Sequence, residues 1–133
     1  MFDKITLRLA PLCSGLDAAF VDATQVAQKV VAGVYNGVTT SQLDELAAET
    51  AAVLSTYHPD FSVLAARIAV SNLHKNTPAR FSEVMAALRA YRHPRTGAEA
   101  PLVSERAAAF AARHAAVLDA AVRHERDYDF DYF

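Results

Sequence analysis

Tryptophan is absent from this 133-residue sequence, cysteine occurs once and glycine only four times. The single cysteine, Cys13, cannot pair within the chain and cannot supply the four Cys or His ligands of a structural zinc site. We therefore expect a reducing, cytoplasmic environment and no resident metal. The four scattered glycines do not form the glycine-rich loop that cradles phosphates.

An excess of charge of one sign is also lacking, because 13 Lys and Arg face 15 Asp and Glu, for a net charge of −2. This balance argues against a broad nucleic-acid surface and against a polybasic patch for membrane binding. No apolar run reaches the length of a membrane span. Hydrophobic residues make up 53% of the chain, which is enough for one globular core.

Apolar residues recur at intervals of three and four, and alanine is abundant, so the sequence predicts an all-α fold without strands. The strongest local signal is Thr39 and Gln42, which have capping-box spacing ahead of an amphipathic stripe. Six helices are expected, over residues 3–12, 22–35, 40–54, 61–73, 81–88 and 105–124. The fourth is apolar on almost every face and should be central and buried. The sixth should be one long helix whose inward residues are Ala107, Phe110, Val117, Leu118 and Ala121.

The last eight residues, 126–133, alternate aromatic and acidic side chains. Alternation with a period of two fits the start of a strand, and a frayed chain end is the alternative. Aromatic residues this dense are unusual at a finished surface. We therefore expect this segment to lead into further structure.

Residue types that usually carry catalysis are sparse in this sequence. The five histidines have no metal-ligand spacing, and each is expected to be a surface or capping residue: His58, His74, His93, His114 and His124. Cys13 has no evident catalytic partner and is expected to be a small buried thiol. No catalytic residue and no metal ligand are therefore predicted.

One arrangement suits a nucleotide. Thr40 and Asp44 lie four residues apart at the start of a predicted helix, so they share a face beside free backbone N–H groups. A hydroxyl and a carboxylate there either hold a ribose or cap the helix, and capping is the default. Lys4 and Lys75 lie near the ends of two other helices and supply positive charge, either for a polyphosphate or as ordinary surface residues.

Three longer stretches carry a family resemblance: MFDKIT from Met1, GVYNGVTTSQLDELAAETAAVL from Gly33 and HPDFSVLAARIAVSNLHKNT from His58. They closely resemble the N-terminal region of the large, catalytic subunit of class I ribonucleotide reductase, of the eukaryotic type. The resemblance covers about the whole chain. It is looser in the alanine-rich helix and returns at Arg126 to Tyr128 and at Tyr132 and Phe133.

The resemblance implies that residues 1–91 form an ATP-cone, a small helical bundle that binds ATP as activator and dATP as inhibitor. Residues 92–133 would then begin the N-terminal helical domain of the reductase. Applied residue by residue, the resemblance implies that Lys4 and Lys75 lie near the phosphates. It also implies that Thr40 and Asp44 contact the nucleotide, with Asp44 near the sugar. The implied partners are these two effectors, further copies of the large subunit and the radical-generating small subunit. No cofactor is expected in this chain.

Two departures from the family pattern affect what we expect of nucleotide binding and catalysis in this chain. Members of the family have a strand pair ahead of the Phe-Asp-Lys-Ile stretch that covers the nucleotide, whereas Met1 stands directly before Phe2 here. We therefore expect a lidless cone in which nucleotide binding is weak or absent. Nucleotide reduction needs a radical thiol and two reducing thiols, so a chain with one cysteine is expected to be catalytically inert.

A different class of function stays open beside the regulatory fragment of a reductase. The chain could be a stand-alone helical interaction module that kept the shape of the cone without catalysis. Solubility and monomeric behaviour would favour the module, because a fragment with exposed apolar surface should aggregate. The zinc-ribbon repressor that also carries an ATP-cone is excluded, because its ribbon needs four cysteines.

Overall fold

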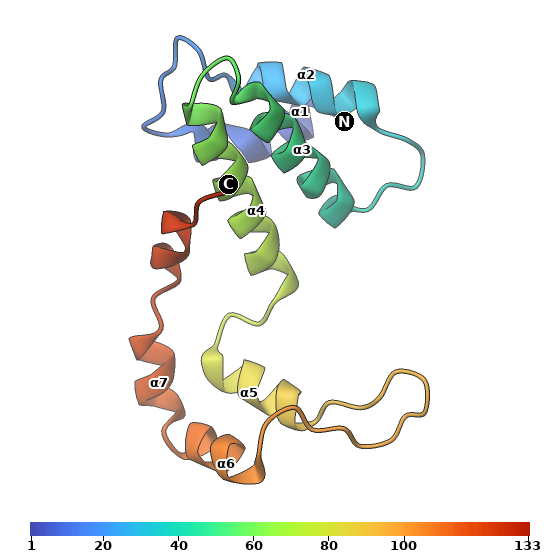
Figure 1. Cartoon of the computed structure of the whole chain (residues 1–133), viewed down its shortest axis with the longest axis vertical. Helices are drawn as coiled ribbons and strands as arrows, with labels where there is room; N and C mark the ends of the chain where they lie inside the picture. The colour runs from blue at the N-terminus through green and yellow to red at the C-terminus, as the bar shows by residue number, and fades with distance from the viewer. The chain divides into compact units, whose positions relative to one another are not determined.

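The computed structural model describes residues 1–133 and contains seven α-helices and no β-strand, which confirms the predicted all-α fold (Figure 1). The chain divides into two compact units. Unit 1 comprises Met1–Asn76 and Arg126–Phe133, and unit 2 comprises Thr77–Glu125. None of the helices combines the length and the apolar character that crossing a bilayer requires.

Each helix falls within one unit. Unit 1 holds α1 (Phe2–Leu9), α2 (Ala23–Gly33), α3 (Thr40–Leu54) and α4 (Asp60–Asn76). Unit 2 holds α5 (Phe81–Arg89), α6 (Glu105–Arg113) and α7 (Ala115–Ala121).

The core of unit 1 lies mainly between α3 and α4, the pair with the most extensive contact. Small side chains contribute to this core and let the two helix backbones approach closely: Ala47, Ala48, Ala51, Ala52 and Ala65 are all buried. Phe61 and Leu64 fill the space that remains, each almost fully buried, which stabilises the fold by about 1.5–3 kcal/mol per side chain. The predicted burial of α4 is confirmed along most of its length, although Val63 and Leu73 are exposed.

One charged residue interrupts the apolar surface of α4. The Nη1 atom of Arg67 donates hydrogen bonds to the carbonyl oxygens of Leu12 and Ser14, each at 2.7 Å. These carbonyls lie at the end of a 3₁₀ turn, Ala10–Cys13, that follows α1 and has a proline near its start. Arg67 therefore ties the loop after α1 to α4, which explains a charge in an otherwise apolar helix.

Unit 2 is held by few buried side chains, and Ala111 is its only buried residue. The stretch expected as one helix over 105–124 is two helices that meet at His114, whose φ of −108° and ψ of 22° leave the helical region. Phe110, Val117 and Ala121 were expected to point inward and are exposed instead. After the break, α7 contacts α5 through Asp119, which accepts hydrogen bonds from the backbone N and the hydroxyl of Ser82, at 2.8 and 2.7 Å.

The C-terminal residues are not a strand. A 3₁₀ turn covers His124–Asp129, and no strand pairing follows it. The strand interpretation is therefore wrong for these residues. A frayed end does not describe them either, because Tyr132 is half-buried and packs against the core of unit 1.

Candidate functional site

The start of α3 is set by its own side chains. The Thr39 hydroxyl accepts a hydrogen bond from the backbone N of Gln42 at 3.2 Å, and the Gln42 side-chain oxygen accepts one from the backbone N of Thr39 at 3.0 Å. This confirms the predicted capping box. The cap fixes where the helix begins, and therefore which face Asp44, one turn further along, presents to the rest of unit 1.

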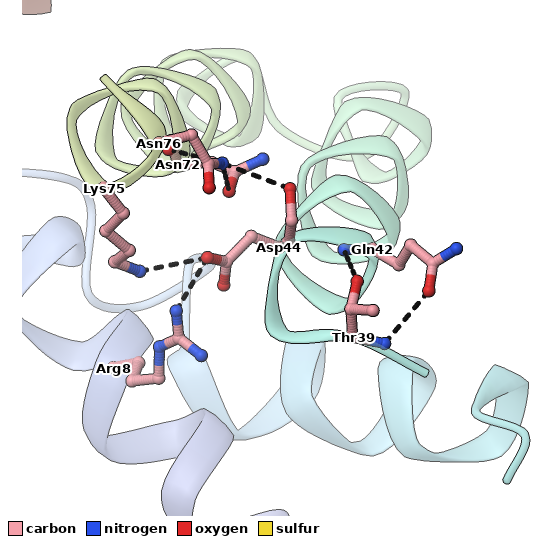
Figure 2. Close-up of polar contacts among 8 residues, drawn as sticks. Arg8, Thr39, Gln42, Asp44, Asn72, Lys75 and Asn76 are labelled. Carbon is pink, nitrogen blue, oxygen red and sulfur yellow. Dashed lines mark hydrogen bonds and ion pairs between the residues drawn. The ribbon is translucent and has the colours of Figure 1, made fainter. Parts of the chain in front are cut away.

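Asp44 is the only buried charged residue of the chain, and two cations share it (Figure 2). Arg8, from the last turn of α1, donates to its Oδ2 atom at 2.7 Å. Lys75, from the last turn of α4, donates to the same oxygen at 3.0 Å. Three helices that are far apart in the sequence therefore meet at one carboxylate oxygen.

The charges at this point do not balance within the cluster. One carboxylate faces a guanidinium and an ammonium, which leaves an excess of one positive charge. The side chains of Arg8 and Lys75 are 33% and 47% exposed, so an incoming anion can reach both. Both cations bind Oδ2, which leaves Oδ1 without a hydrogen bond from the protein and able to accept one from a ligand. Two neighbouring cations also oppose the binding of a metal ion here.

The structure brings two of the four predicted site residues into direct contact and leaves the other two open to solvent. Asp44 and Lys75 form the ion pair described above. Thr40 is the first residue of α3 and is exposed, one helical turn before Asp44. Lys4 is exposed on α1, without a hydrogen bond or ion pair within the chain, one turn before Arg8 on the same face.

The sequence-based prediction missed Arg8. Its spacing of four from Lys4 puts both cations on one face of the first helix, and this was the signal that could have identified it. A second missed contact joins the end of α4 to the start of α3, where the Asn76 amide donates to the Ser41 hydroxyl at 3.2 Å. That amide also donates to the Asn72 side chain at 2.9 Å, so it braces the end of α4 against the start of α3 (Figure 2).

Cys13 does not resemble a catalytic thiol. Desolvation in its half-buried position, together with the negative charge of Asp22, raises the pKa of the Cys13 thiol, and the nearby Arg67 only partly offsets the shift. A raised pKa lowers the fraction of the nucleophilic thiolate at neutral pH. The thiol expected to be buried is therefore only half-buried, and its low reactivity stays a prediction.

Comparison with known proteins assigns the region that contains the Asp44 site to a family. Residues 2–76 match the model of the ATP cone domain. The chain is 52% identical over 132 residues to the ribonucleoside-diphosphate reductase large subunit of Caenorhabditis elegans, covering 99% of this chain and 17% of the relative. The corresponding subunit of Arabidopsis thaliana is also 52% identical over 132 residues, and that of Vaccinia virus 48% over 133. The chain thus spans about a sixth of the length of these relatives.

Proposed function

Because the chain belongs to the ATP cone domain family, we propose that unit 1 binds an adenine nucleotide, ATP or dATP, as an allosteric effector. The observation that best supports this function is the buried carboxylate of Asp44, which two partly exposed cations hold through one oxygen while the other oxygen is free. A site of this kind offers positive charge for phosphates and an oriented acceptor for a sugar hydroxyl.

In the proposed complex, Lys75 and Lys4 contact the phosphates, and Arg8 joins them from the same face of α1 as Lys4. Thr40 lies at the exposed N-terminus of α3, where free backbone N–H groups favour an anion. The Oδ1 atom of Asp44 accepts a hydrogen bond from a sugar hydroxyl. A buried acceptor discriminates between sugars, because the loss of one hydroxyl changes which group can satisfy it.

We further propose that the chain is the overall-activity module at the N-terminal region of a ribonucleoside-diphosphate reductase large subunit. In such a subunit, ATP would activate and dATP would inhibit, by changing how large subunits assemble with one another and with the radical-generating small subunit. Residues 1–91 and 92–133 would correspond to the cone and to the start of the helical domain. A cytoplasmic location belongs to the same proposal. The chain has one cysteine, so we expect it to reduce no nucleotide by itself.

The test is a titration of the ¹⁵N-labelled chain with ATP and with dATP, up to millimolar nucleotide, followed by NMR. This method detects weak as well as tight binding. We expect the amide signals at the start of α3 and the end of α4 to shift. Asp44→Asn should lower the affinity by about tenfold or more, as expected when a charged hydrogen bond is lost.

Glu105→Gln is the matched control, because Glu105 is an exposed carboxylate in unit 2 without an ion pair. It should bind nucleotide as the unmodified chain does. Absence of shifts at millimolar nucleotide would refute the proposed function. So would equal losses of affinity in Asp44→Asn and Glu105→Gln, because the effect would then be one of overall charge.

A further inference from the structure

The C-terminal segment, defined as Arg126–Phe133, returns to unit 1 after the chain has passed through unit 2. Its contacts with α4 are specific. The Nε2 atom of His74 lies 2.7 Å from the Oδ2 atom of Asp127, and the His74 ring meets the edge of the Tyr128 ring with centroids 5.7 Å apart. Arg126 and Phe130 line an apolar groove on the same helix together with Ala69, Val70 and Leu73. The segment is therefore docked along α4.

The end of this segment reaches the cavity that contains Asp44. Tyr132 packs against the core and lines a cavity of about 150 Å³. The other walls come from α3 and α4, and they include the candidate nucleotide residue: Asp44, Glu45, Ala48, Glu49, Ala69 and Asn72. The C-terminal segment thus shares a cavity with Asp44, one residue of the proposed effector site.

A second connection runs through the last turn of α4. His74 holds the C-terminal segment through Asp127, and Lys75, the next residue, holds Asp44. Neighbouring helical residues point about 100° apart, so the two side chains serve adjoining faces of one helix end. A phosphate drawn to Lys75 would lie close to the His74–Asp127 pair.

Carboxylates are frequent both in the C-terminal segment and on the α3 wall of the cavity. The segment carries Asp127, Asp129 and Asp131 beside one cation, Arg126, and the α3 wall carries Asp44, Glu45 and Glu49. Only Asp44 among the three wall carboxylates has cationic partners. Docking therefore depends on the half-buried ring of Tyr132, on His74 and on the neutralisation of Asp44, against repulsion between like charges. A polyphosphate would add negative charge and would compete with Asp44 for Lys75.

We propose that docking of the C-terminal segment and occupancy of the Asp44 site are negatively coupled, so that a bound nucleotide loosens the segment and the docked segment weakens nucleotide binding. The segment would then be the element through which the effector site acts on whatever adjoins residue 133. The coupling to nucleotide rests on the proposed function. The underlying link between the Asp44 charge and docking does not, and it can be tested without nucleotide. Coupling between two binding events is reciprocal, so each direction predicts the other.

A single introduced tryptophan reports the docking, because the chain contains none of its own. In Tyr132→Trp, the emission maximum and the rate of quenching by acrylamide distinguish a docked from a solvent-exposed ring. Tyr132→Trp combined with His74→Ala gives the reference for an undocked segment. Without nucleotide, adding Lys75→Met leaves Asp44 less neutralised, so quenching should rise at least twofold. Adding Asp44→Asn to that variant should reverse the rise, because it removes the repelling charge.

The reciprocal measurement needs no reporter. Tyr132→Ala should bind ATP at least twofold more tightly than the unmodified chain, as followed by NMR. Tyr57→Ala is the matched control, because Tyr57 is a tyrosine of unit 1 outside the C-terminal segment and is 79% exposed; its affinity should be unchanged. In the Tyr132→Trp reporter, a saturating concentration of ATP should also raise the quenching of the introduced tryptophan.

Several results would overturn the inference. They are quenching of the introduced tryptophan that does not change with Lys75→Met, a rise in quenching that Asp44→Asn does not reverse, and equal ATP affinities in Tyr132→Ala and Tyr57→Ala. A nucleotide that shifts the Thr40 amide without altering the tryptophan fluorescence would also contradict it. If no nucleotide binds at all, the proposed function fails and with it the coupling to nucleotide, whereas the two charge variants still decide whether Asp44 and the segment are linked.

Discussion

Replacing Arg67 by methionine should destabilise unit 1 measurably, although Arg67 is not one of the proposed nucleotide-binding residues. Two short hydrogen bonds from one charged group are lost, to the carbonyls of Leu12 and Ser14. Hydrogen bonds to charged groups contribute roughly 1.5–3 kcal/mol each. Ser14 is exposed and its carbonyl regains water in the variant, so the second bond counts for less. Methionine keeps most of the apolar stem of the arginine in place. The expected loss is about 2 kcal/mol.

Thermal unfolding followed by circular dichroism measures this loss. For a domain of this size, about 2 kcal/mol corresponds to a fall in Tm on the order of 10 °C. Arg67→Lys keeps the charge and can reach one carbonyl, so its Tm should fall between those of Arg67→Met and the unmodified chain. Lys29→Met is the control, because Lys29 is an exposed cation of α2 without an ion pair, and its Tm should hardly move. If Arg67→Met is as stable as Lys29→Met, Arg67 does not hold the loop after α1 and the reasoning is refuted.

Three further predictions concern packing and ionisation. Ala65→Leu should destabilise the chain by about 1–3 kcal/mol in urea unfolding, because Ala65 is fully buried in the core of unit 1, whereas Ala112→Leu on the exposed surface of α6 should not. Hydrogen bonds from Ser82 hold the pKa of Asp119 below its usual value, so they stabilise the fold above the unfolded pKa. The stability difference between the unmodified chain and Ser82→Ala should therefore shrink as the pH falls through the lower, folded pKa of Asp119; a difference that does not change with pH would contradict this. Cys13 should react with iodoacetamide more slowly in the native chain than in urea and faster as the pH rises, because burial raises its pKa. Equal rates in both states would count against that cause.

Local sequence signals predicted where most helices begin, because a helix start is decided by residues within one turn of it. Thr39 and Gln42 form the capping box, and the Asp22 and Ser104 side chains each accept a hydrogen bond from the first turn that follows them. The start of α5 was predicted from its apolar stripe, not from a cap. Arg80, the residue before the helix, makes no side-chain cap, and a hydrogen bond to the first turn comes instead from Asp119, 37 residues away from Ser82.

The same limit applies to two features that the sequence did not predict. Alanine-rich sequence favours a continuous helix through His114, whereas the structure divides it there into α6 and α7, both of which contact α5. The four candidate site residues were chosen by resemblance and by spacing, and their roles stay predictions. Spacing along one helix could pair Thr40 with Asp44, but only the packing of α1, α3 and α4 reveals that Arg8 shares the carboxylate.

Unit 1 is discontinuous along the chain, because its last eight residues are separated from the rest by the whole of unit 2. The loop around Arg92 and Arg95 in unit 2 is exposed and is a natural site for trypsin. A single cut there would turn the molecule into a two-chain complex held only by noncovalent contacts, among them those of the C-terminal segment with α4. The melting temperature of the nicked protein should then depend on its concentration, as in a heterodimer. The order of segments along this chain thus makes it suitable for division into two complementary halves.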